Sequence, residues 1–179
     1  TLSIDTPHAL VTDEASLIAQ ALEVHAQALS NRGGEIVQLG TGPLGISLPG
    51  VLDNTDGRIA ANAQDLALAA SVLRNTGGTI EHAGSGQLVL TAGSIDNSGG
   101  QLLADQALTV HAREALVNAD GLIVAGQALT LDAGSIDNRG GTVASLAQAL
   151  DVTARAGAIG NEGGRLLAGG AVEVRSQGL

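Results

Sequence analysis

The chain has 179 residues, of which 44% are hydrophobic and 15% charged, and its formal net charge is −10. It contains no Phe, Trp, Tyr, Met or Cys, which excludes an aromatic-filled globular core, disulfides and thiolate metal sites. The acidic balance, with only eight scattered arginines, argues against binding of nucleic acid and of sulfated polysaccharides.

Residues 1–30 form the least regular part of the sequence. Leu2 and Ile4 alternate as in a strand, and residues 6–8 have the composition of a turn. The apolar residues of 16–29 are also spaced for an amphipathic helix, but residues 21–26 nearly repeat residues 107–112, which lie inside a strand-rich repeat. We therefore predict a strand at 21–26 and treat 1–30 as an irregular first coil.

Seven asparagines recur at residue-number differences of 23, 21, 22, 21, 20 and 23: Asn31, Asn54, Asn75, Asn97, Asn118, Asn138 and Asn161. A period near 22 is short for two packed helices and fits one coil of a solenoid. If equivalent residues of successive coils stack in register, each amide can donate to one neighbour and accept from the other. We predict such a structural ladder for all seven.

A glycine follows each asparagine by three residues: Gly34, Gly57, Gly78, Gly100, Gly121, Gly141 and Gly164. The residue before it is glycine in five copies and Asp56 or Asp120 in the other two. Because Gly, Asn and Asp tolerate positive φ, the motif predicts a tight corner.

Aliphatic residues recur in three further columns. One lies two residues before the asparagines (Leu29, Leu52, Leu73, Ile95, Leu116, Ile136, Ile159), and one lies five residues after them (Ile36, Ile59, Ile80, Leu102, Ile123, Val143, Leu166). The third is an alternating pair farther along the coil (Leu66 and Leu68, Leu88 and Leu90, Leu108 and Val110, Leu129 and Leu131, Leu150 and Val152, Val172 and Val174). These columns predict short strands with one buried face. The fold class is therefore all-β, a parallel β-helix of about eight coils that forms one segment over residues 1–179.

Two local features fit this register. Pro43 and Pro49 flank a short expected strand at 44–48 and predict a bulged coil at about 38–50 rather than a domain boundary. Residues 92–97 and 133–138 are identical hexapeptides two coils apart. Extra residues around 84–86 and 155–157 should form outward loops.

The polar residues do not predict an active site, a metal site or a cofactor site. His8, His25, His82 and His111 are expected to point to solvent, and His25 and His111 lie four coils apart. Asp53, Asp96 and Asp137 share the column before the asparagine, at least one coil apart, and only Asp53 and Asp56 could approach each other. The period near 22 also differs from the nine-residue unit of calcium-binding β-rolls.

The recurring pattern [LI]-x-N-x-G-G-x-[LIV]-x-[AS] resembles the haemagglutinin repeat of filamentous haemagglutinins and of contact-dependent growth inhibition exoproteins. The resemblance extends from about Ile18 to the C-terminus, and residues 136–145 match it best. Asp56, Asp120 and the proline-containing coil depart from it.

This resemblance implies a right-handed β-helical shaft in a large Gram-negative exoprotein, secreted or held at the cell surface. It also implies export through an outer-membrane two-partner secretion transporter, and adhesive or toxin modules carried by the shaft. Because repeats reach both ends of the chain, we expect it to be part of a longer protein, and no apolar run is long enough for membrane insertion. The alternatives are a face that binds a host receptor, target-cell receptor or glycan, and a polysaccharide-degrading β-helix.

Overall fold

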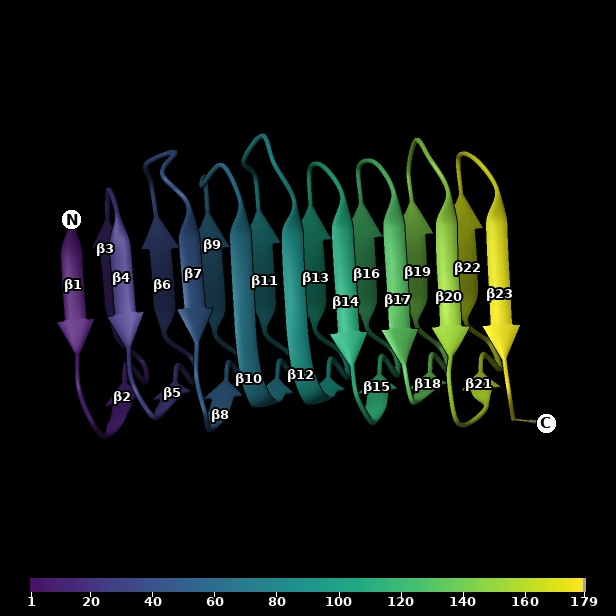
Figure 1. Cartoon of the computed structure of the whole chain (residues 1–179), viewed down its shortest axis with the longest axis horizontal. Coiled ribbons are helices and arrows are strands. Elements are labelled where there is room, and N and C mark those ends of the chain that lie inside the picture. The colour runs from purple at the N-terminus through teal and green to yellow at the C-terminus, as the bar shows by residue number, and fades with distance from the viewer. Residues whose placement is uncertain (179) are drawn as a thin grey trace.

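The computed structural model describes residues 1–178, and all regular structure within them is β-strand. Parallel strands wind into a single β-solenoid of about eight coils, as the repeat predicts. From the N-terminus the chain runs down the nearer side and up the farther side while it advances toward the C-terminus (Figure 1). The solenoid is therefore right-handed.

Each coil contributes to three faces. Face A is the nearer side in Figure 1, and its parallel strands are β1 (Leu2–Asp5), β4 (Leu22–His25), β7 (Leu44–Ser47), β10 (Leu66–Arg74), β12 (Leu88–Asp96), β14 (Leu108–Ala112), β17 (Leu129–Ala133), β20 (Leu150–Ala154) and β23 (Val172–Ser176). The strand β4 confirms the prediction of strand rather than helix at 21–26.

Face B is short and follows face A in every coil. It consists of β2 (Ala9–Val11), β5 (Ala28–Ser30), β8 (Val51–Asp53), β15 (Ala115–Val117), β18 (Ser135–Asp137) and β21 (Ile159–Gly160), together with the C-terminal parts of β10 and β12. In each of those two coils one nine-residue strand continues unbroken from face A into face B.

Face C is a separate eight-stranded sheet on the farther side of the solenoid (Figure 1). Its strands are β3 (Ser16–Ala19), β6 (Glu35–Gln38), β9 (Arg58–Ala61), β11 (Thr79–His82), β13 (Gln101–Ala104), β16 (Leu122–Ala125), β19 (Thr142–Ser145) and β22 (Arg165–Ala168). The chain reaches face C from face B through the corner that contains the asparagine.

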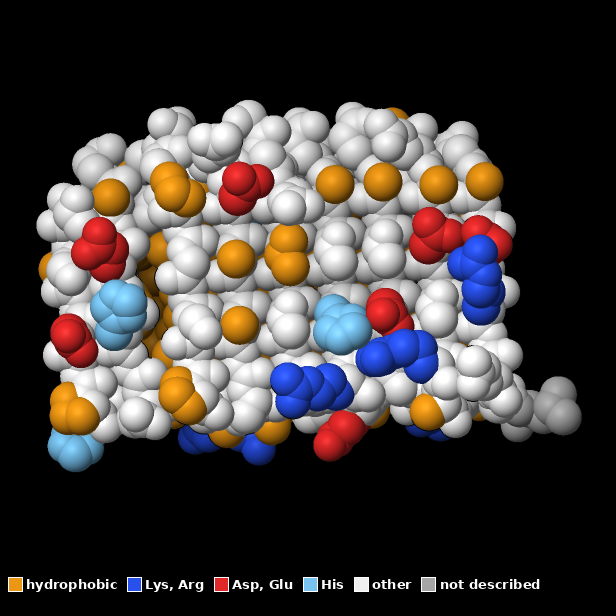
Figure 2. Space-filling model, viewed as in Figure 1, with side chains coloured by type: hydrophobic (Ala, Val, Ile, Leu, Met, Phe, Trp, Pro, Cys, Tyr) orange, Lys and Arg blue, Asp and Glu red, His pale blue; other side chains and the backbone are white. Residues whose placement is uncertain are grey.

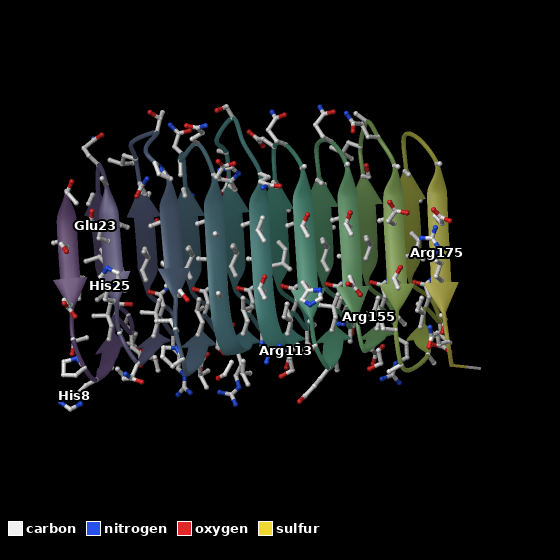
Figure 3. The ribbon with its side chains drawn as sticks, viewed as in Figure 1. His8, Glu23, His25, Arg113, Arg155 and Arg175 are labelled. Atoms are coloured by element: carbon white, nitrogen blue, oxygen red, sulfur yellow. The ribbon has the colours of Figure 1, made fainter. Side chains whose placement is uncertain are left out.

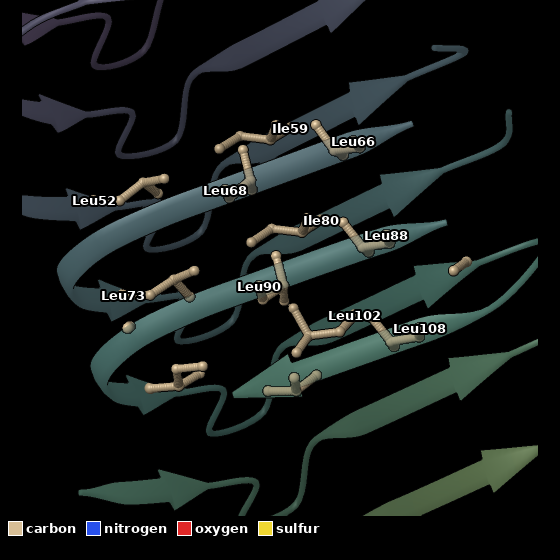
Figure 4. Packing of buried hydrophobic residues seen from close by; sticks show 14 of the residues in the cluster. Leu52, Ile59, Leu66, Leu68, Leu73, Ile80, Leu88, Leu90, Leu102 and Leu108 are labelled. Atoms are coloured by element: carbon tan, nitrogen blue, oxygen red, sulfur yellow. The ribbon is translucent and has the colours of Figure 1, made fainter. Parts of the chain in front are cut away.

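The core is a column-by-column stack of aliphatic side chains from all three faces. Leu88 pairs in register with Leu66 on one side and Leu108 on the other, and each of the three is at most 1% exposed. Ile80 on face C is likewise buried between Ile59 and Leu102 (Figure 4). Every predicted inward column enters this core along most of its length, because a single coil cannot bury its own inner side.

The ends and the bulge depart from this regularity. Val172 and Val174 follow the inward pattern but are 47% and 48% exposed, because β23 is the edge strand of face A. The strand β7 lies between Pro43 and Pro49, and all four of its residues pair in register with β10 of the next coil. Residues 84–86 and 155–157 form bends between strands. Within residues 1–178 no helix is present that could cross a membrane.

Candidate functional site

The seven asparagines form one continuous hydrogen-bonded column at the corner between faces B and C. Each Nδ2 donates to the Oδ1 of the asparagine one coil later, at 2.6–2.7 Å in all six steps. The first six asparagines have no exposed surface, and Asn161 is partly buried. The column therefore links every pair of adjacent coils from the second to the eighth through a buried amide contact.

Backbone carbonyls fix the direction of this column. The Nδ2 atom of Asn97 also lies 3.2 Å from the carbonyl oxygen of Gly100 and 3.4 Å from that of Leu122. An amide turned the other way would place its own oxygen against these carbonyls and lose the hydrogen bonds. The same arrangement recurs at the other interior corners, so all amides donate toward the C-terminal end.

Two adjacent positions of the corner meet different requirements, one for a positive φ angle and one for close contact between coils. Positive φ occurs two residues after the asparagine, at Gly33, Asp56, Gly77, Gly99, Asp120, Gly140 and Gly163. The invariant glycine comes one residue later, and glycine is required there for a different reason. A Cβ atom on Gly100 would lie 2.0 Å from the carbonyl oxygen of Asn75 and 2.8 Å from Asn97 Oδ1. Stacking of the ladder, rather than the φ angle, requires glycine there.

Thr12 begins the column, at a corner that no asparagine marks in the sequence. Its Oγ1 lies 2.8 Å from Asn31 Oδ1 and occupies the place of an asparagine one coil earlier. Leu10 pairs with Leu29, Leu17 pairs with Ile36, and Glu14 takes the positive-φ position with φ of 54°. Extending the repeat register by 19 residues upstream would have identified this corner.

The aspartates before the asparagines act within the corner. Asp53, Asp96 and Asp137 each accept a hydrogen bond from the backbone N–H two residues later, at 3.0–3.1 Å. Such bonds stabilise a turn. Asp56, which the sequence suggested could approach Asp53, occupies the positive-φ position, with its Oδ1 over Gly77 of the next coil.

Asp53 is the most buried of these carboxylates, with a side chain only 7% exposed. Burial by itself raises its pKa, but hydrogen bonds from Thr55 and Arg32 outweigh burial and bring the pKa below its ordinary value. Thr55 Oγ1 lies 2.6 Å from Asp53 Oδ1, and Arg32 Nη2 lies 2.7 Å from Oδ2. The carboxylate thus ties two adjacent coils together in its ionised form.

His82 is not on the surface, which corrects the prediction that it points to solvent. It has no exposed surface, its Nε2 lies 3.0 Å from the carbonyl oxygen of Ala63, and its Nδ1 has no partner. The strand alternation explains the burial, because His82 is two residues beyond the inward Ile80 and shares its side of the sheet.

The column that contains His82 is otherwise mainly alanine, and its polar members bind loop backbone at the corner between faces C and A. Gln38 accepts a hydrogen bond from the N–H of Leu22 and donates to the carbonyl of Gly42 at 2.6 Å. Ser145 donates to the carbonyl of Gln127, also at 2.6 Å. These three buried polar residues therefore support the second corner from within.

The other histidines lie outside the core. His8 and His25 are exposed, and His25 projects from face A (Figure 3). His111 is half-buried, with its Nδ1 3.2 Å from Asp132 Oδ2. Among residues 1–178, no group of three His, Cys, Asp or Glu side chains lies close enough to hold a metal ion.

Charged side chains gather over the C-terminal strands of face A, beside a row of neutral polar ones (Figure 2). A shallow hollow of about 390 Å³ is lined there by Thr130, Asp132, Asp151, Thr153, Arg155, Glu173 and Arg175. Arg155 Nε lies 2.7 Å from Asp132 Oδ1, and Arg175 pairs with Glu173. Because these side chains are at least 33% exposed, the hollow is a solvated, ion-paired surface.

Comparison with known proteins agrees with this architecture. The family model described as "Haemagglutinin repeat" matches residues 1–42, 39–99, 83–150 and 142–179. The chain is also 35% identical over 136 residues to a protein named "Toxin CdiA" from Yersinia pestis, an alignment that covers 76% of this chain and 4% of that protein. No solved structure matches the chain. The repeat, the parallel β-solenoid and these matches together show that the chain belongs to the haemagglutinin-repeat family.

Proposed function

We propose that this chain is a rigid shaft segment of a large secreted or cell-surface exoprotein, and that it holds adhesive or toxin modules away from the cell. The uninterrupted amide column supports this function best. It couples each coil to the next through equivalent contacts between asparagine side chains.

The geometry suits a spacer because each additional coil lengthens the solenoid by the same distance. Neighbouring parallel strands are ~4.8 Å apart, so eight coils extend roughly 38 Å. Each coil contacts mainly its two neighbours, so stiffness and length depend on the number of coils rather than on a distant contact.

Export through an outer-membrane two-partner secretion transporter belongs to the same proposal. A chain without cysteine cannot be held folded by disulfides before export. Each coil can then form on the preceding one outside the cell, because its strands pair with strands already in place.

A deletion of residues 97–137 tests the spacer function. It removes two coils and rejoins the chain within the hexapeptide shared by residues 92–97 and 133–138, so every column keeps its register. We expect cooperative unfolding to persist and the longest dimension, measured by small-angle X-ray scattering, to shorten by about 10 Å. Deletion of residues 97–107 removes half a coil, breaks the register and should abolish cooperative unfolding.

Binding and activity assays separate the spacer from its alternatives. The isolated chain should show no saturable binding to host or target cells and release no product from uronate-containing polysaccharides. Saturable binding that is lost when one surface column is mutated would instead identify an adhesive face, and product release would identify an enzyme.

A further inference from the structure

The outer surface of face C carries an aliphatic column that the core does not explain. One outward position of each strand aligns in register from β3 to β22: Ile18, Val37, Ala60, Glu81, Leu103, Val124, Ala144 and Leu167. All but Glu81 are apolar. The corresponding column on face A contains Asp5, His25, Ser47, Ala69, Thr91, His111, Asp132, Thr153 and Arg175.

Two members of this column are strongly exposed, four are half-buried, and Ala60 and Ala144 are only 6% exposed. Ile18 and Leu167, on the two edge strands of face C, are 52% and 50% exposed. Leu39 and Leu146, each directly after a face C strand, are 50% and 65% exposed. An aliphatic column of this length on an exposed sheet is typical of a surface that another protein covers.

Face C is also electrically neutral in a chain of net charge −10. Its outward charges are Glu35, Arg58, Glu81 and Arg165. Arg58 pairs with Glu35 at 2.8 Å and with Glu81 at 3.0 Å, while Arg165 makes no ion pair among residues 1–178. A second copy could therefore approach this face without the repulsion expected at other acidic surfaces.

Apart from Glu81, which is related to Leu103, the column is apolar on both sides of the middle of the sheet, between β11 and β13. A two-fold axis along the strand direction would place β3 of one copy over β22 of the other and β6 over β19. Ile18 would then face Leu167 of the second copy, and Leu39 would face Leu146. Arg165 of one copy would be displaced by about one strand position from Glu35 of the other, beside the group of Glu35, Arg58 and Glu81 that carries a net charge of −1.

We propose that face C is a docking surface for a second copy of this chain, with the two solenoids antiparallel and their face C sheets packed together. Eight strands of about four residues cover roughly 500 Å² per copy, or ~1,000 Å² in total, which places the interface at the weak end of specific association. This proposal is independent of the spacer function, which a single rod can also perform.

Cross-linking tests the antiparallel pairing, because the chain has no native cysteine. Leu39 and Leu146 are five coils apart within one copy, about 24 Å, but face each other across the proposed interface. The double variant Leu39→Cys/Leu146→Cys should give a covalent dimer with a short bismaleimide, whereas Leu39→Cys alone should not. The double variant Ser47→Cys/Thr153→Cys, with the same spacing on face A, is the matched control and should remain monomeric.

Sedimentation equilibrium tests the interface without cross-linking. Leu146→Glu/Leu167→Glu should raise the dimer Kd at least tenfold, while Val11→Glu, on the exposed edge of face B, should leave it unchanged. Circular dichroism and melting temperature establish that each variant folds. A wild-type chain that stays monomeric well above micromolar concentration would overturn the proposal. So would a covalent dimer from Leu39→Cys alone, from the face A pair, or equal weakening by Val11→Glu.

Discussion

At the asparagine corner, from the second asparagine onward, the glycine three residues after the asparagine lies directly against the carbonyl oxygen of the asparagine one coil earlier. The sequence motif predicts a tight corner from residues that tolerate positive φ, and the structure places that φ one position before the invariant glycine. Contact between coils, which a single-coil pattern does not reveal, accounts for the glycine itself.

Two adjacent alanine substitutions separate these roles. Gly99→Ala meets no atom within 4 Å and should destabilise the chain by about 1 kcal/mol, because alanine must adopt positive φ. Gly100→Ala places a Cβ against the Asn75 carbonyl and should cost about 3 kcal/mol or more. Urea unfolding of both variants measures the difference, and equal losses would contradict the proposed contact.

Removal of one amide from the column should also be costly. Asn97→Ala removes the 2.7 Å hydrogen bond that Asn75 Nδ2 donates to Asn97 Oδ1 and leaves Asn118 Oδ1 without its donor, both in buried positions. We expect a loss of about 3 kcal/mol in thermal or urea unfolding. Asn62→Ala removes an exposed amide with one long contact to Leu39 and serves as the control, with a loss below about 0.5 kcal/mol. A similar loss in both variants would argue against a stabilising ladder.

The buried carboxylate of Asp53 predicts a defined pH dependence. Its folded-state pKa is lowered, so its contribution is present above the ordinary value near 4 and is lost as pH falls through the lowered value. Asp53→Asn should therefore cost about 1–2 kcal/mol at pH 7 and progressively less below about pH 4. Unfolding titrations of both proteins from pH 7 to pH 2 test this, and a constant difference would exclude the ionised carboxylate as the cause.

At the level of strands, period-two alternation predicts which side chains enter the core. It places Leu108 inside and Thr109 outside, and β14 has this arrangement. The same rule would have placed His82 inside, two positions after Ile80. The prediction that His82 points to solvent did not follow this rule and was wrong.

A pair of aspartate substitutions measures the strength of this alternation. Leu108→Asp introduces an unpaired carboxylate between Leu88 and Leu129 and should cost about 3–5 kcal/mol. Thr109→Asp introduces the same group on the outside and should change stability by less than about 1 kcal/mol. Differential scanning calorimetry compares the two variants, and equal melting temperatures would contradict the inward assignment of Leu108.

For the whole molecule, the sequence was sufficient to predict a solenoid because stacking turns a one-dimensional repeat directly into columns. The asparagine spacing predicts the coils, and the aliphatic columns predict the core. The polar support by Gln38 and Ser145 depends on contact with loop backbone of a neighbouring coil, which the repeat pattern does not encode. Thr12, by contrast, lies where the repeat register extended upstream places it.

The exposed surface of face C follows from the same alternation. Leu103 and Val124 come directly after the predicted inward residues Leu102 and Ile123, and the structure places both on the outer side of face C. A sequence rich in leucine and alanine cannot distinguish an inward column from an outward one until the corners fix the phase of each strand.

The common direction of the buried amides gives the rod a polarity. Each finished coil presents one unused amide hydrogen at its leading edge, at the position where the Oδ1 atom of the next asparagine must arrive. The leading edge is therefore a template that accepts an asparagine in one orientation and one register. Folding from the first coil toward the last would extend this template by one asparagine per coil.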